Sequence, residues 1–122
     1  MPYEPTRTYL IDRSATTRSL MSSALERLTD TQIVGHAEQH GDAVDAIGLA
    51  QPHLVICDRP AVAASAAPFH QAVADVDARL LLYCALWPSQ SLEQLHALGY
   101  EQVVAKRLDG FEELIAAVVG LR

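Results

Sequence analysis

The sequence is constrained most by a run of four apolar residues, Leu54-Val55-Ile56-Cys57, that leads directly into the carboxylate of Asp58. A strand that is apolar at every position is typical of a parallel sheet whose two faces are both covered by helices. The run therefore predicts a strand buried on both faces. It also predicts that Asp58 lies at the edge of the sheet where this strand ends.

The rest of the chain alternates between strand-like and helix-like segments. We expect strands at residues 8–12, 32–37, 54–57, 79–84 and 102–105. We expect helices at residues 15–28, 41–50, 69–76 and 90–98, and from Asp109 to the end of the chain. Five strands that alternate with five helices predict parallel strands joined by right-handed crossovers, with helices on both faces of the sheet.

Local signals predict where several of these helices begin. Ser14 and Ser89 can cap the first and fourth helices, and Asp109 with Glu112 resembles a capping box before the last helix. Pro68 interrupts an alanine-rich stretch, so we expect a loop up to this residue and a helix after it. The apolar face of the first helix is predicted to consist of Leu20, Ala24, Leu25 and Leu28.

Length and composition exclude several classes of function. The 122 residues suffice for one domain, which we expect to span residues 1–122. The net charge is −6, so the chain has no electrostatic reason to bind nucleic acid or anionic lipid directly. Its apolar runs are too short to cross a bilayer and its N-terminus lacks the character of a signal peptide, which predicts a cytoplasmic protein. Cys57 and Cys84 lack CxxC spacing and are predicted to be core residues in a reducing compartment.

Four polar or reactive residues stand at the carboxyl ends of the predicted strands: Asp12, Asp58, Cys84 and Lys106. In open sheets of parallel strands, functional groups gather beyond these ends. Paired carboxylate oxygens suit Mg²⁺, and a lysine ammonium suits phosphate oxygens. A carboxylate held between them can attack a phosphoryl group to form an acyl phosphate. These residues therefore indicate a site that works mainly by positioning charges.

Four segments of the chain occur in the order and at the spacing of a known family. They are Leu10–Ser14, Ile33–Ala37 with Gly41–Val44, Gln51–Asp58, and Gln102–Lys106. On these segments the chain resembles, over essentially its whole length, the receiver domains of two-component response regulators. The resemblance implies a flavodoxin-like α/β receiver fold, a single doubly wound sheet of five parallel strands in the order 2-1-3-4-5 with five helices.

The resemblance also implies roles for particular residues. Asp58 corresponds to the phospho-accepting aspartate, Lys106 to a lysine that contacts the phosphate, and Cys84 to a position usually held by Ser or Thr. The implied Mg²⁺ ligands are Asp12, Asp58 and the backbone carbonyl of Pro60. The implied partners are a histidine kinase or phosphotransfer protein and an output partner or effector domain.

Several positions depart from the family's pattern. Arg13 stands where the family has its second metal-supporting acid, and Cys84 stands where it has the hydroxyl of strand four. Val103 replaces the switch aromatic, and Arg107 replaces the proline after the lysine. Arg13 has two interpretations: a solvated side chain, or a guanidinium that lies against Asp58 or Asp12 in the metal's place. Asp12 is either a metal ligand or the ion-pair partner of Arg13 or Lys106. These departures argue against Mg²⁺ binding.

The family commonly uses the face between the fourth and fifth helices for dimers or output partners. By resemblance we assign this role, including a homodimer, to the surface that includes Leu98, Tyr100 and Val103. Trp87 is expected either to pack against the core or a loop, or to join such an interface.

Three functions remain open at this point. The first is a receiver-type signalling module with an atypical pocket that acts through protein contacts and is not an enzyme. The second is a conventional phospho-switch that accepts a phosphoryl group from a histidine kinase on Asp58. The third is a small enzyme on a flavodoxin-like sheet, which the lack of a glycine-rich phosphate loop and of a G-x-S-x-G motif disfavours.

Overall fold

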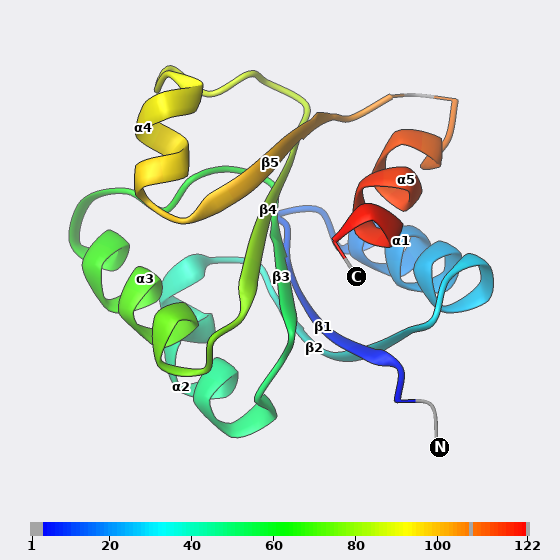
Figure 1. Ribbon diagram of the computed structural model, residues 1–122, viewed down its shortest axis with the longest axis horizontal. Coiled ribbons are helices and arrows are strands. Elements are labelled where there is room, and N and C mark those ends of the chain that lie inside the picture. The colour runs from blue at the N-terminus through cyan, green and yellow to red at the C-terminus, as the bar shows by residue number, and fades with distance from the viewer. Residues whose placement is uncertain (1–3, 108, 122) are drawn as a thin grey trace.

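The computed structural model describes residues 4–107 and 109–121, and contains a parallel sheet flanked by helices on both faces (Figure 1). The strands are β1 (Thr6–Ile11), β2 (Thr31–Ala37), β3 (Leu54–Cys57), β4 (Arg79–Cys84) and β5 (Tyr100–Ala105). The helices are α1 (Ala15–Leu28), α2 (His40–Ala50), α3 (Ala66–Asp75), α4 (Leu92–Ala97) and α5 (Glu112–Gly120). The strand order is β2-β1-β3-β4-β5, which confirms the predicted doubly wound fold.

The central strand β3 is buried at every position, as its sequence predicts. Val55 and Cys57 contribute to the core beneath α2, α3 and α4, whereas Leu54 and Ile56 contribute to the core beneath α1 and α5. Figure 1 shows the two groups of helices on opposite faces of the sheet. Because both faces are covered, all four side chains are at most 2% exposed.

Helix α1 begins where the sequence predicts but presents a different face to the core. Ser14 caps it by accepting a hydrogen bond from the Thr17 amide. The buried residues of this helix are Met21, Ala24 and Leu25. Leu20 and Leu28 are each 56% exposed, so their predicted place in the core is wrong. Leu20 lies about 100° around the helix from Met21, and Leu28 is the last residue of the helix.

Helices α3 and α4 also begin at other residues than predicted. Helix α3 begins at Ala66, after a short 3₁₀ turn at Ala63–Ser65, and includes Pro68 in its first turn. A proline is tolerated there because the first amides of a helix have no partner within it. Helix α4 is capped by Ser91 rather than Ser89, because only Ser91 forms the reciprocal capping box with Gln94.

Helix α5 begins at Glu112 without a side-chain cap, so the capping box predicted from Asp109 is wrong. Its first turn is instead bound by Arg107, whose Nε lies 2.5 Å from Oε1 of Glu113. Both side chains of this pair are largely exposed. Within the two described ranges, no helix is long and apolar enough to span a membrane.

Gly35 allows the edge strand β2 to lie against the ring of Tyr9. The register between β1 and β2 shifts at this point, so that Tyr9 pairs with Gly35 and Val34 is passed over. A Cβ at position 35 would lie 2.6 Å from Cε2 of Tyr9, whose side chain is buried. Glycine usually weakens a strand, but at position 35 close packing requires it.

We expect Gly35→Ala to lower the free energy of unfolding by about 1–3 kcal/mol, because the new methyl group must displace the packed Tyr9 ring. Gly48→Ala is the matched control, since Gly48 lies in α2 and nothing lies within 4 Å of its Cβ position. There the same change should stabilise the protein by about 0.5–1 kcal/mol. Urea denaturation of both variants measures the two effects, and equal effects would contradict the close approach of Tyr9.

Candidate functional site

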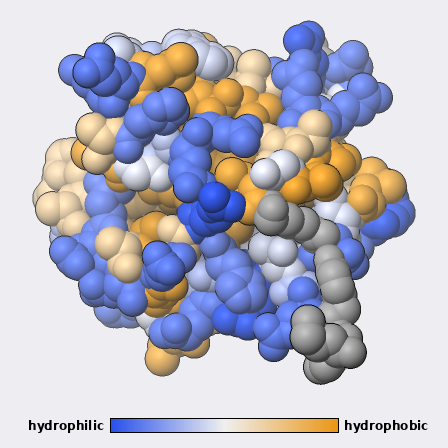
Figure 2. Space-filling view, viewed as in Figure 1, coloured by the Kyte–Doolittle hydropathy of each residue, from blue (hydrophilic) through white to orange (hydrophobic). Residues whose placement is uncertain are grey.

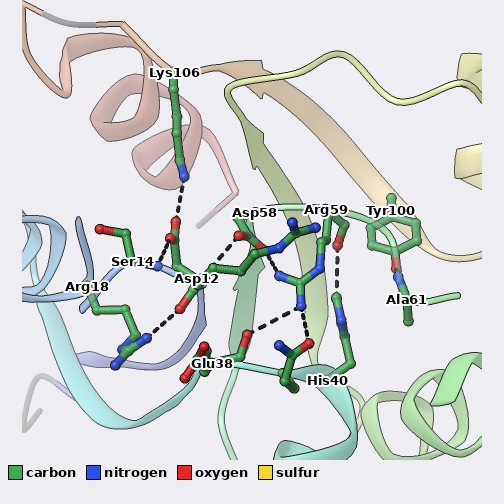
Figure 3. Close-up of polar contacts among 12 residues, drawn as sticks. Asp12, Ser14, Arg18, Glu38, His40, Asp58, Arg59, Ala61, Tyr100 and Lys106 are labelled. Atoms are coloured by element: carbon green, nitrogen blue, oxygen red, sulfur yellow. Dashed lines mark hydrogen bonds and ion pairs between the residues drawn. The ribbon is translucent and has the colours of Figure 1, made fainter. Parts of the chain in front are cut away.

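The parallel sheet brings the predicted site residues to one edge. Asp12 follows β1, Asp58 follows β3, and Lys106 follows β5. Two backbone hydrogen bonds prolong the strand pairing to these residues: the Asp58 amide donates to Ile11 O at 2.9 Å, and the Lys106 amide donates to Cys84 O at 2.8 Å. Figure 3 shows the side chains of Asp12, Asp58 and Lys106 gathered in this pocket.

Asp12 is paired with Lys106. The Asp12 side chain is 3% exposed, and its Oδ2 lies 2.6 Å from Lys106 Nζ. Its other oxygen, Oδ1, accepts a hydrogen bond from the Ser14 amide at 2.9 Å. Arg18 donates to the Asp12 backbone carbonyl from the neighbouring helix, at 2.5 Å. Of the interpretations open from the sequence, the structure therefore has Asp12 as the ion-pair partner of Lys106, because a buried carboxylate needs a compensating charge.

Asp58 is paired with the residue that follows it. Arg59 Nη1 lies 2.5 Å from Asp58 Oδ1, and the two side chains are 18% and 10% exposed. The same guanidinium continues to the loop between β2 and α2, where Nη2 donates to Gln39 Oε1 at 2.5 Å and is 3.4 Å from Glu38 O. Arg59 thus joins the β3–α3 loop to the β2–α2 loop (Figure 3).

Of the two interpretations of Arg13, the structure has the solvated side chain rather than a guanidinium against the carboxylates. Arg13 contributes its backbone amide, which donates to Asp58 Oδ2 at 3.1 Å, while its side chain is exposed. In the ion pairs of the described residues, Asp58 is paired with Arg59 and Asp12 is paired with Lys106. The sequence contained a signal for this arrangement, since Arg59 directly follows Asp58, but only the fold shows which of two nearby arginines turns inward.

Two further residues that the sequence analysis did not assign to the site hold the β3–α3 loop. His40 is 4% exposed and its Nε2 donates to Arg59 O at 2.9 Å. Burial lowers the pKa of His40 below its ordinary value of 6.5, which favours the neutral ring. On the other side of the loop, the Ala61 amide donates to the Tyr100 hydroxyl at 3.1 Å.

Tyr100 does not lie on the surface predicted for it. Its side chain is fully buried in the core beneath α2, α3 and α4, where its hydroxyl also shares a hydrogen bond of 2.9 Å with His70 Nε2. Burial raises the pKa of this hydroxyl well above its ordinary value. Tyr100 is therefore a structural support for the loop after Asp58 and is not available to a docking partner.

Cys84 and Pro60 are both buried near the carboxylates. Burial raises the pKa of the Cys84 thiol to about 11, so the group stays protonated near neutral pH and is only a weak hydrogen-bond donor. Cys57, at the end of β3, is also a buried free thiol. Pro60 lies between Arg59 and Ala61, the two residues whose backbones are held by His40 and Tyr100.

The carboxylates in this arrangement do not fit Mg²⁺. Each of the four oxygens of Asp12 and Asp58 already accepts a hydrogen bond, and one oxygen of each acid contacts a cation. The two acids and two bases carry no net charge together, whereas Mg²⁺ requires oxygen ligands in near-octahedral geometry and is bound by carboxylates. Among the residues that the structure describes, no group of three or more His, Cys, Asp or Glu side chains could hold a metal ion.

Comparisons with known proteins agree with the fold. No protein-family model matches the sequence, and a search of curated proteins finds no match. Among solved structures, the receiver domain of the response regulator NarL from Mycobacterium tuberculosis aligns with a TM-score of 0.80 at 21% identity. The alignment covers 98% of this chain and 97% of that chain.

Two signalling complexes contain similar chains. A chain of the complex between the CheA3 P1 domain and CheY6 from R. sphaeroides has a TM-score of 0.81 at 21% identity, over 98% of both chains. A chain of the CheX–CheY–BeF3–Mg²⁺ complex from Borrelia burgdorferi has a TM-score of 0.76 at 17% identity, over 97% of this chain and 90% of that chain. At these identities the likeness establishes the fold: the chain has the fold of response regulator receiver domains.

Loss of the Lys106 ammonium should leave the buried Asp12 charge without its cation. We expect Lys106→Met to lower the free energy of unfolding by roughly 3 kcal/mol, and a second change, Asp12→Asn, to restore part of this loss. Arg107→Met is the control, because its pair with Glu113 is exposed and should contribute less than about 1 kcal/mol. Denaturant titration of the three variants measures these values. A double variant less stable than Lys106→Met alone would contradict the proposed cause.

Proposed function

We propose that this chain is a receiver module of two-component signalling whose acidic pocket is closed by internal ion pairs and which acts through protein–protein contacts. The observation that carries the proposal is the pairing of Asp12 with Lys106 and of Asp58 with Arg59 at the carboxyl edge of a receiver fold. The carboxylate that the fold presents as a phospho-acceptor is already engaged on both oxygens. In this proposal Asp58 acts mainly as part of a structural network.

The proposal includes partners of two kinds. One is a histidine kinase or phosphotransfer protein, by analogy with the R. sphaeroides complex of the CheA3 P1 domain with CheY6. The other is an output partner or effector domain. We infer no enzymatic activity of the module itself, a cytoplasmic location, and no direct contact with nucleic acid, which the net charge of −6 disfavours.

The second candidate is a conventional phospho-switch in which Asp58 accepts a phosphoryl group from a histidine kinase. Two observations favour it: Asp58 keeps some exposure, at 10% of its side chain, and Lys106 lies in the same pocket. Phosphorylation would require Arg59 to release Oδ1. The phosphorylated state would also lack the hydroxyl donor that Cys84 replaces and the switch aromatic that Val103 replaces.

Incubation with a small acyl phosphate and Mg²⁺, followed by intact-mass measurement, separates the two candidates. We expect little or no gain of a phosphoryl group, because Arg59 and the Arg13 amide occupy the Asp58 oxygens. Asp58→Asn identifies any gain on this residue, and Asp45→Asn, an exposed acid of α2, is the matched control. A robust gain of one phosphoryl group that is lost only in Asp58→Asn would establish the phospho-switch.

A surface near α4 supports the proposed protein contacts. Exposed apolar side chains occupy the β4–α4 loop, helix α4 and its C-cap. They are Leu86, Trp87, Leu92 and Leu98, which are 87%, 59%, 52% and 44% exposed. Trp87 is therefore not a core residue, and it lines an open groove with Val103 of β5 and Ala116 of α5. Apolar surface gathers in the upper part of the view in Figure 2. We assign the homodimer or output contact to this apolar surface.

We expect the protein to form a concentration-dependent dimer that Leu86→Asp weakens, because the new charge would have to be desolvated in the interface. Leu49→Asp is the matched control, since Leu49 of α2 is also a leucine with 87% exposure but lies away from this surface. Sedimentation velocity over a range of concentrations measures both variants. A wild-type protein that stays monomeric at high concentration would remove the dimer and leave only the output contact.

A further inference from the structure

The Arg59 guanidinium lies among oxygen atoms that are typical ligands of a divalent cation. Its two terminal nitrogens contact the Asp58 carboxylate, the Gln39 side-chain amide oxygen and the Glu38 backbone carbonyl. Carboxylate, amide and carbonyl oxygens are the groups that bind hard divalent ions in proteins. In Figure 3 the guanidinium lies between Asp58 and Glu38, on the side of Asp58 away from Lys106.

We propose that Arg59 is a tethered cation that fills a latent divalent-metal site, formed by Asp58 with the β2–α2 loop residues Gln39 and Glu38. In the native chain the site is closed to Mg²⁺ because the guanidinium already contacts these oxygens and neutralises Asp58. Replacement of Arg59 by a neutral residue opens the site. Asp12 takes no part, because Lys106 and the Ser14 amide hold its two oxygens.

The surrounding contacts keep Asp58 and the loop that follows it in place when the guanidinium is removed. His40 binds the backbone carbonyl of Arg59, and Tyr100 binds the amide of Ala61, so the loop after Asp58 is held by contacts that do not involve the Arg59 side chain. Asp58 itself is fixed by its own amide on Ile11 O and by the Arg13 amide on Oδ2. Asp58 can therefore accept an ion with little reorganisation of its own.

The charges of the pocket also favour a cation at this position. Without Arg59, the cation that remains in the pocket is Lys106, and it is paired with Asp12. Asp58, whose side chain is 10% exposed with Arg59 in place, would then lack a paired cation, which is unfavourable for a largely buried carboxylate unless a positive ion replaces the guanidinium. Arg13 cannot replace it from its present position, because its side chain is exposed and only its amide reaches Asp58.

Isothermal titration of the whole chain with MgCl₂ tests the proposal. We expect saturable binding to Arg59→Gln. The wild type and Arg59→Lys, which keeps the charge, should show none even at Mg²⁺ concentrations about tenfold above the dissociation constant of Arg59→Gln. Arg13→Gln is the matched control, because it removes the neighbouring guanidinium that does not contact the carboxylates, and it should behave as the wild type. Saturable binding to the wild type equal to that of Arg59→Gln would overturn the proposal.

Two second-site changes test which residues bind the ion. In the Arg59→Gln background, Asp58→Asn should abolish Mg²⁺ binding and Gln39→Ala should weaken it; binding unaffected by both changes would contradict the assigned ligands.

Thermal denaturation tests the site in a variant that is too unstable to titrate. Arg59→Ala should have a lower melting temperature than the wild type, and added Mg²⁺ should raise it, whereas the melting temperature of the wild type should not respond. A lack of any Mg²⁺ effect in both Arg59 variants would overturn the proposal. None of these outcomes depends on whether Asp58 is phosphorylated, so they test the latent site separately from the signalling role.

Discussion

Two carboxylates stand at the ends of neighbouring strands in this protein, and the architecture of the pocket follows from the need to neutralise them. β1 and β3 pair in parallel, so their carboxyl ends bring Asp12 and Asp58 to one largely buried edge of the sheet. Like charges repel strongly where water is excluded. Lys106 neutralises Asp12 at 2.6 Å, and Arg59 neutralises Asp58 at 2.5 Å. Each acid thus has its own cation within the chain, and no divalent ion is needed to balance the site.

The two ion pairs connect different parts of the fold. Lys106 is 94 residues from Asp12, so their pair joins the end of β5 to the end of β1 across the sheet. Arg59 is adjacent to Asp58 and spans a short distance in sequence, but its second nitrogen reaches the β2–α2 loop. With His40 and Tyr100 holding the backbone on either side of Pro60, the loop after Asp58 is bound by three separate elements. A change of charge at Asp58 would therefore act on the β2–α2 loop through Arg59, in addition to any effect near α4.

Sequence patterns predicted most of the fold, and they failed where a residue's partner lies in another element. The apolar run before Asp58 predicted a doubly buried strand, because a short run that includes the β-branched Val55 and Ile56 suits a strand covered on both faces. Leu20 was misassigned because several residues of α1 share its apolar character and only packing selects the buried face. The cap of α4 is an error of another kind: Gln94 stands three residues after Ser91, so the sequence itself favours Ser91 over Ser89. Tyr100 was placed on a surface by family resemblance, although its register in β5 directs it into the core.

In the candidate site, too, the sequence determines some features and the tertiary structure determines others. The sequence alone determined that Asp12, Asp58 and Lys106 meet at one edge, because strands that run in parallel bring their carboxyl ends together whatever the details of packing. It could not determine which cation contacts which acid. Arg13 and Arg59 each directly follow an aspartate at a strand end, and their side chains have the same charge and reach. Only the tertiary structure decided between them: the turn after β1 directs the Arg13 amide toward Asp58, whereas the loop after β3, held by His40 and Tyr100, places the Arg59 guanidinium among the oxygens of Asp58, Gln39 and Glu38.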